Sequence, residues 1–127
     1  MNKYTELSDF EINKEVASHD LPCDYNINEH TKTVELIIFL GDTDEYNVYG
    51  EFDPCNNPYY AMPIIIENNI SLRAPHLREG WMAEYTGSGD DVNDGFQSDY
   101  FDAHNKNPYR AAMEVFLMIK SADNEKV

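Results

Sequence analysis

The histidines, cysteines and hydroxyl side chains are the groups in this sequence that could carry out acid–base or covalent chemistry. The four histidines are scattered, and no H-E-x-x-H motif is present. No serine or cysteine stands in a nucleophile motif, and no glycine-rich phosphate loop follows a strand-like segment. His104 is close to Asp102, but a pair of surface loop residues explains this spacing better than a catalytic dyad. We therefore predict no catalytic residues and no enzymatic activity.

Cys23 and Cys55 stand far apart in the sequence and form no C-x-x-C pair. The N-terminal segment has no apolar signal core, so we expect a cytoplasmic location in which both thiols stay reduced. A metal site built on these cysteines would need histidine or carboxylate ligands that the spacing does not supply. We predict neither a metal nor a cofactor.

The densest run of carboxylates falls in residues 90–102. Its members are Asp90, Asp91, Asp94, Asp99 and Asp102. If these carboxylates lie on one face, they would imitate DNA, which carries one charge per ~1.7 Å, and would bind a basic protein. As a solvated loop, they would have no partner, which is the usual role of a charge run. An EF-hand does not fit, because Val92 and Phe101 stand where ligands are required, although a weaker loop-type cation site stays an alternative.

Two further sets of residues extend this candidate protein-binding surface. Asp42, Asp44 and Glu45 lie between two strand-like runs, at the tip of an expected hairpin, where polar residues are also common without any function. Tyr100 and Phe101 stand among the aspartates, and aromatic side chains beside charge are typical of protein interfaces where they are exposed.

The net charge restricts the partners that this protein can have. Twenty-four Asp plus Glu against nine Lys plus Arg give a formal charge of −15. Such a field repels nucleic acid and anionic membranes and favours basic proteins, although acidity also simply keeps a small protein in solution. The apolar runs are far shorter than the ~20 residues that span a bilayer. We predict no direct contact with nucleic acid or membrane.

The first half of the chain predicts one helix and one hairpin. Ser8 and Glu11 form a capping box, which indicates a helix that ends near residue 20, before a proline. Residues 33–40 and 46–53 are rich in β-branched and aromatic side chains, and a short loop between them would make a hairpin.

The second half predicts two more helices around short strands. Asn57-Pro58 indicates the start of a helix that reaches about residue 69, with a kink at Pro63. Residues 70–72 and 81–86 are typical of strands.

The region after the last of these strands is expected to hold a loop, a helix and a tail. Residues 87–106 indicate a long acidic loop. Residues 109–120 indicate a helix that is apolar around most of its circumference and is therefore buried on several sides. Trp81 and Tyr109 are expected in the core, and residues 121–127 are expected to form a frayed tail.

These elements predict one domain over residues 1–127 of the α+β class. Hairpins in place of regular β-α-β alternation indicate a small antiparallel sheet of three to four strands with about three helices packed against it.

Three sequence segments carry a resemblance to a known family. They are L-S-D-F-E-I-N at residues 7–13, D-P-C-N-N-P with A-M-P-I-I in residues 53–68, and N-P-Y-R-A-A-M at residues 107–113. Together these segments resemble the NinX-like phage proteins, a family of unknown function. The last two also resemble phage domains described as α-β-α sandwiches. Tyr59, Tyr60 and Met62 depart from the residues expected at those positions. The resemblance implies a phage or prophage accessory protein in the bacterial host cytoplasm, and it implies no catalytic residues.

These observations favour a non-enzymatic acidic protein that binds and modulates a basic host or phage protein. The more specific form of this hypothesis is a DNA mimic. The alternative is a small-molecule or nucleotide-binding protein that sequesters its ligand in a cleft lined by Tyr and Trp. The shortage of arginines for pairing with phosphate counts against this alternative. The sequence does not indicate an oligomeric state.

Overall fold

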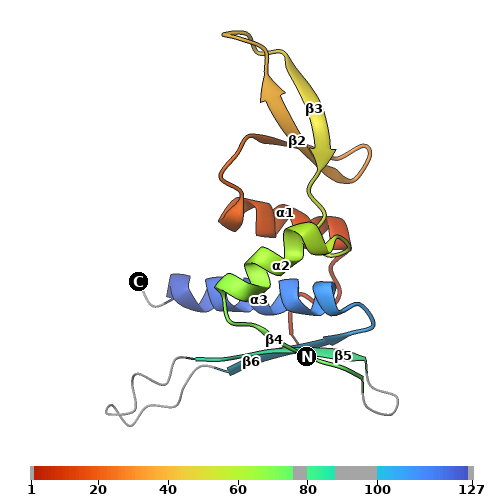
Figure 1. The fold of residues 1–127 in the computed structure, drawn as a ribbon, viewed down its shortest axis with the longest axis vertical. Helices are drawn as coiled ribbons and strands as arrows, with labels where there is room; N and C mark the ends of the chain where they lie inside the picture. The colour runs from red at the N-terminus through yellow and green to blue at the C-terminus, as the bar shows by residue number, and fades with distance from the viewer. Residues whose placement is uncertain (1, 76–79, 88–99, 126–127) are drawn as a thin grey trace.

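A computed structural model describes residues 2–75, 80–87 and 100–125, and these residues form stacked layers of helices and sheets (Figure 1). The helices are α1 (Asp9–Asp20), α2 (Pro58–Glu67) and α3 (Pro108–Glu125). One antiparallel sheet contains β1 (Tyr25–Asn28), β2 (Thr33–Phe39) and β3 (Tyr46–Glu51), in that order. The other contains β4 (Ser71–Arg73), β5 (Trp81–Thr86) and β6 (Tyr100–Asn105). The predicted α+β class is confirmed.

The strands form two sheets because α3 lies between them. Figure 1 shows α3 on the sheet β4–β5–β6, with α1 and α2 on its other side and the β2–β3 hairpin beyond them. Eight consecutive side chains of α3 are buried, from Arg110 to Leu117, and Ile119 is buried as well. A helix that is apolar all round needs cover on opposite sides, and one sheet cannot supply it.

The helix starts follow the sequence closely. The Ser8 Oγ accepts a hydrogen bond from the Glu11 backbone N–H at 3.1 Å, and the Ser8 N–H donates to the Glu11 carboxylate at 3.0 Å. This hydrogen bonding lowers the pKa of Glu11. Asn57 caps α2 through the Tyr59 N–H at 3.0 Å, and the helix then continues through Pro63. The capping box and the N-terminus of α2 are therefore confirmed.

The predicted hairpin is confirmed and projects from the body of the molecule (Figure 1). Phe39 faces Tyr46 across the strands, and the Leu40 N–H donates to the Glu45 carbonyl at 2.8 Å to close the loop. Gly41 has a φ of 60°, which a residue without a Cβ adopts at little cost. Val34 and Leu36, in the half of β2 nearer the body, are buried in the core.

Two expectations from the sequence are wrong at the C-terminal end. The acidic loop expected over 87–106 is strand β6 from residue 100 onward, because its backbone pairs with β5 and Ala103 packs into the core. Residues 88–99 lie outside the described part of the chain. The tail expected at 121–127 is helical as far as Glu125, since no proline or glycine interrupts α3 there. Strand β1 was not expected at all, because its sequence, Tyr-Asn-Ile-Asn, is half polar.

No helix within the described residues is both long and apolar enough to cross a membrane.

The start of β5 leaves no room for a side chain, and this predicts the effect of one substitution. A Cβ at Gly80 would lie 2.8 Å from the backbone oxygen of Asn105. Because that neighbour is backbone, Gly80→Ala should lower the free energy of unfolding by about 1–3 kcal/mol, measured by urea denaturation. Gly50→Ala is the control, since its Cβ would meet only the Leu36 side chain at 3.5 Å and the Tyr60 hydroxyl at 3.8 Å. Equal losses in both variants would contradict this interpretation of the β5–β6 contact.

Candidate functional site

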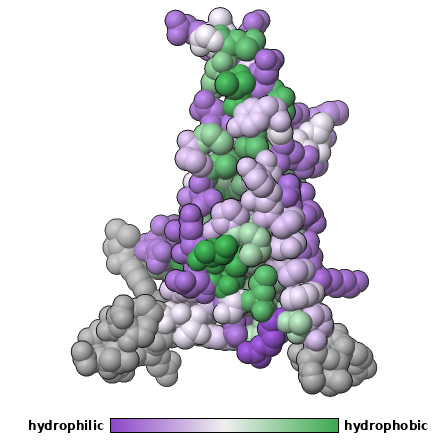
Figure 2. Space-filling model, in the orientation of Figure 1, coloured by the Kyte–Doolittle hydropathy of each residue, from purple (hydrophilic) through white to green (hydrophobic). Residues whose placement is uncertain are grey.

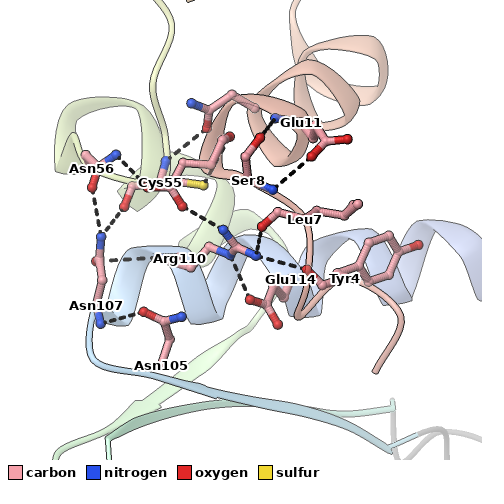
Figure 3. Close-up of polar contacts among 12 residues, drawn as sticks. Tyr4, Leu7, Ser8, Glu11, Cys55, Asn56, Asn105, Asn107, Arg110 and Glu114 are labelled. Carbon is pink, nitrogen blue, oxygen red and sulfur yellow. Dashed lines mark hydrogen bonds and ion pairs between the residues drawn. The ribbon is translucent and has the colours of Figure 1, made fainter. Parts of the chain in front are cut away.

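A buried arginine on α3 holds the N-terminal part of the chain (Figure 3). The Arg110 side chain is 7% exposed, and its Nε donates to Glu114 at 2.7 Å. One Nη donates to the Asp9 carboxylate at 2.6 Å. The other donates to the carbonyls of Tyr4 and Leu7, at 2.9 and 2.8 Å. The guanidinium therefore joins α3, the start of α1 and the segment before it.

Asparagine side chains extend this network toward the loop between β3 and α2 (Figure 3). The Asn107 amide donates to the Cys55 carbonyl at 2.6 Å and to the Asn56 side-chain oxygen at 3.1 Å. The Asn107 oxygen accepts from the Tyr109 N–H at 2.9 Å and so caps α3. The Asn13 side chain, from α1, accepts from the Cys55 N–H at 3.2 Å. The three segments that carry the family resemblance thus meet at one place.

This network is a closed structural unit and not an open binding site. Burial lowers the pKa of Arg110, but its hydrogen bonds to Asp9 and Glu114 outweigh burial and raise it. Burial, with the nearby Asp9 charge, raises the pKa of the Cys55 thiol, which therefore stays protonated and unreactive. Among the described residues, every buried side-chain N and O atom has a hydrogen-bond partner. A ligand would find no unsatisfied buried group there.

The acidic residues proposed from the sequence do not gather into one patch within the described structure. Asp42, Asp44 and Glu45 occupy the hairpin tip, whereas Asp102 lies on β6 at the opposite end of the molecule (Figure 1). The remaining members lie outside the described residues: Asp90, Asp91, Asp94 and Asp99. No group of three or more His, Cys, Asp or Glu side chains that could hold a metal occurs in the described ranges.

Asp102 and His104 form a pair, but both side chains are exposed to solvent. The His104 Nε2 lies 3.2 Å from the Asp102 carboxylate. The His104 side chain is 49% exposed and the Asp102 side chain is 41% exposed. Nearby on the same sheet, the Tyr100 hydroxyl donates to Glu84 at 2.8 Å, and this hydrogen bond raises the pKa of Tyr100. Tyr100 is exposed, while Phe101 is half-buried and stacks on a neighbouring tyrosine, so the two aromatic candidates differ in accessibility.

The two aromatic residues expected in the core, Trp81 and Tyr109, are half-buried and not fully buried. Trp81 is the first residue of β5, and Tyr109 lies in the first turn of α3.

One feature that the sequence analysis missed is an exposed apolar surface on the hairpin. Figure 2 shows apolar groups along this projecting element and again over the region of α2. We call six exposed side chains the hairpin surface: Ile38, Phe39, Leu40, Tyr46, Val48 and Tyr49. Their exposed fractions range from 39% to 61%. The continuous apolar run in β2 is typical of a strand covered on both faces, yet no described element covers its outer half.

Both faces of the hairpin contribute to this surface. Phe39 and Tyr46 contact each other edge to face with ring centroids 6.0 Å apart, and Val48 shares their face by strand alternation. Ile38 and Leu40 point to the opposite face by the same alternation. Residues 33–51 contain no lysine or arginine, so the charged side chains that the hairpin itself contributes are all carboxylates.

A hollow of about 470 Å³ lies between the N-terminal segment, β6 and α3. Its described lining includes Tyr100, Phe101, His104 and Met118 but no lysine or arginine. This lining offers aromatic contact without the cations that phosphate recognition needs, so the hollow gives little support to nucleotide binding.

Comparison with protein-family models matches residues 3–120 to the family described as "Bacteriophage P22, NinX". The matched range contains the whole Arg110 network and the hairpin surface. No curated protein and no solved structure matches this chain.

The buried arginine predicts a large loss of stability on substitution. Arg110→Met keeps much of the side-chain volume but leaves the Glu114 carboxylate, 1% exposed, without its cation. Removing one partner of a buried ion pair costs about 3–5 kcal/mol, so urea denaturation should show a loss of that size. Arg73→Met breaks the exposed pair with Glu84 and should cost less than about 1 kcal/mol. Similar small losses in both variants would contradict the structural role of Arg110.

The two cysteines should react at very different rates with a thiol reagent. Cys23 is exposed and Cys55 is buried in the core. A thiol-specific chromophore should therefore label one cysteine in the native protein and the second only on unfolding in urea. Cys23→Ser is the control and should abolish the native reaction. Rapid native labelling of Cys55 in that variant would contradict the closed packing of the network.

Proposed function

Because this chain belongs to the bacteriophage P22 NinX family, we propose that it is a phage accessory protein that binds another protein through its β2–β3 hairpin. The protein acts in the bacterial host cytoplasm, and its effect comes from binding and not from catalysis. The partner is a host or phage protein with an apolar groove that has basic residues at its rim.

The observation that carries this proposal is the exposure of the hairpin surface. Exposed apolar area costs roughly 25 cal/mol per Å², and six neighbouring side chains share this cost on one projecting element. Contiguous apolar surface on a protein in water is typical of an interaction site. The aromatic members, Phe39, Tyr46 and Tyr49, are of the kind that dominates binding energy in protein interfaces.

The chemistry of the partner follows from the charges around this surface. Asp42, Asp44 and Glu45 stand at the tip, and no cation lies in the hairpin to neutralise them. A basic rim would complement the tip, and the net charge of −15 would speed the encounter. DNA mimicry would need many carboxylates on one face. The distance between the tip and Asp102 favours insertion of the hairpin into a groove instead (Figure 1).

The test is affinity capture from nuclease-treated bacterial lysate at low and high salt, read by mass spectrometry. The wild-type chain should retain one stoichiometric protein. The double variant Ile38→Ser/Phe39→Ser should lose it by at least about tenfold, because both faces of the hairpin lose an apolar anchor. The tip variant Asp42→Asn/Asp44→Asn/Glu45→Gln should weaken capture mainly at low salt, where charge steering is strongest.

The matched control is Ile66→Ser on α2, which removes an exposed apolar side chain outside the hairpin. This variant should retain the partner as the wild type does. Equal capture by the hairpin variant and the control would refute the proposal, provided that both variants keep the wild-type melting temperature.

A further inference from the structure

We infer that β3 pairs with β3 of a second copy of this chain. The two strands run antiparallel, and the two β1–β2–β3 sheets become one continuous sheet in a twofold-symmetric dimer. This pairing uses the edge of the hairpin, whereas the proposed partner contacts its faces, so the inference goes beyond the proposed function and does not depend on it.

The outer edge of β3 has the hydrogen-bonding capacity to pair with another strand. The sheet order places β2 on one side of β3 and no described strand on the other. The Leu40 N–H donates to the Glu45 carbonyl, which makes this a bonded pair, and antiparallel pairs alternate between bonded and non-bonded. Asn47 therefore bonds inward to Ile38. The N–H and C=O groups of Tyr46 and Val48 therefore point outward, to the free edge.

The outer part of this edge lacks the features that keep edge strands apart. Native edges are commonly guarded by lysine, by proline or by a bulge. Strand β3 contains neither lysine nor proline, and Glu51, at its inner end, is its only charged residue. The register shift leaves Tyr49 unpaired as a bulge, which also lies toward the inner end. The stretch from Tyr46 to Val48 is regular and open.

The outward-facing backbone groups also define a register for the pairing. An antiparallel pair that uses both outward residues of each strand places Tyr46 opposite the partner copy's Val48, with the twofold axis at Asn47. Aromatic and β-branched side chains opposite each other are favourable cross-strand pairs. Phe39 and Tyr46 of each copy then extend one apolar face across the junction.

The charges of the chain favour a second copy in this register. Glu45 falls opposite Tyr49 of the second copy, and Asp44 falls opposite Gly50. No carboxylate of β3 or the tip faces another carboxylate directly. Two chains of charge −15 repel at most orientations, so the uncharged, self-complementary stretch from Tyr46 to Gly50 offers an approach that the acidic surface does not. Because both β3 edges are used, the assembly closes as a dimer.

The first test is sedimentation velocity over a concentration series at low and high salt. The wild-type chain should be dimeric, and salt should tighten the dimer because it screens like charges. Val48→Pro removes an N–H that faces outward, which an edge strand tolerates, and should weaken the dimer at least about tenfold. Val48→Thr keeps the N–H and should stay dimeric. A wild-type chain that is monomeric throughout both series would overturn the inference.

The second test fixes the register and does not depend on the proline variant folding. In a Cys23→Ser background, Asn47→Cys brings two thiols together on the twofold axis, at a non-bonded pair with Cα atoms about 4.5 Å apart. Mild oxidation should convert the native protein to a disulfide-linked dimer. Tyr59→Cys in the same background, exposed but off the axis, should cross-link far more slowly. Equal cross-linking rates would overturn the pairing.

These outcomes separate the dimer from the proposed function. Salt should tighten the self-pairing and weaken capture of the basic partner. Loss of the dimer in Val48→Pro with capture retained leaves the partner proposal standing, and loss of capture in Ile38→Ser/Phe39→Ser with the dimer retained leaves the pairing standing.

Discussion

The ion pair between Arg110 and Glu114 is the constraint on which the rest of the structure depends. Both groups lie inside the core, where an unpaired charge costs several kcal/mol. The two Nη groups of the guanidinium are satisfied by Asp9 and the carbonyls before α1, because Glu114 on α3 accepts only from Nε. The requirement to pair one cation thus brings the N-terminal segment onto a helix about a hundred residues later. Apolar packing around α3 supplies most of the burial, and the ion pair selects where the first helix lies.

The same network determines which part of the hairpin is fixed and which part is available for binding. Asn13 and Asn107 hold the backbone of Cys55, immediately after the hairpin returns to the body. Val34 and Leu36 bury the inner half of β2. The outer half extends beyond every described layer, so its apolar side chains stand in water on a fixed base (Figures 1 and 2). An element held at its base loses little further freedom on binding, which favours affinity.

Local patterns in the sequence predicted local structure well. The capping box at Ser8, the hairpin loop and the proline-started helices α2 and α3 depend on neighbouring residues, and all are present. The division into two sheets depends on pairing between distant segments, so the sequence alone did not indicate it, and β6 was mistaken for loop. The buried ion pair of Arg110 and Glu114 was not predicted, because the guanidinium is also held by Asp9 from a distant segment. The hairpin surface was missed because it also depends on distant segments. The sequence of an apolar strand does not indicate whether another element covers that strand.

The most direct measurement is photo-cross-linking inside bacterial cells, with a photoreactive phenylalanine analogue at Phe39. We expect an adduct with one protein of basic composition, distinct in mass from the chain's own dimer. The same analogue at Tyr59, which is exposed on α2, should give no such adduct. An adduct of equal yield from both positions, or none from Phe39, would contradict the claim that the hairpin is the binding element of this protein.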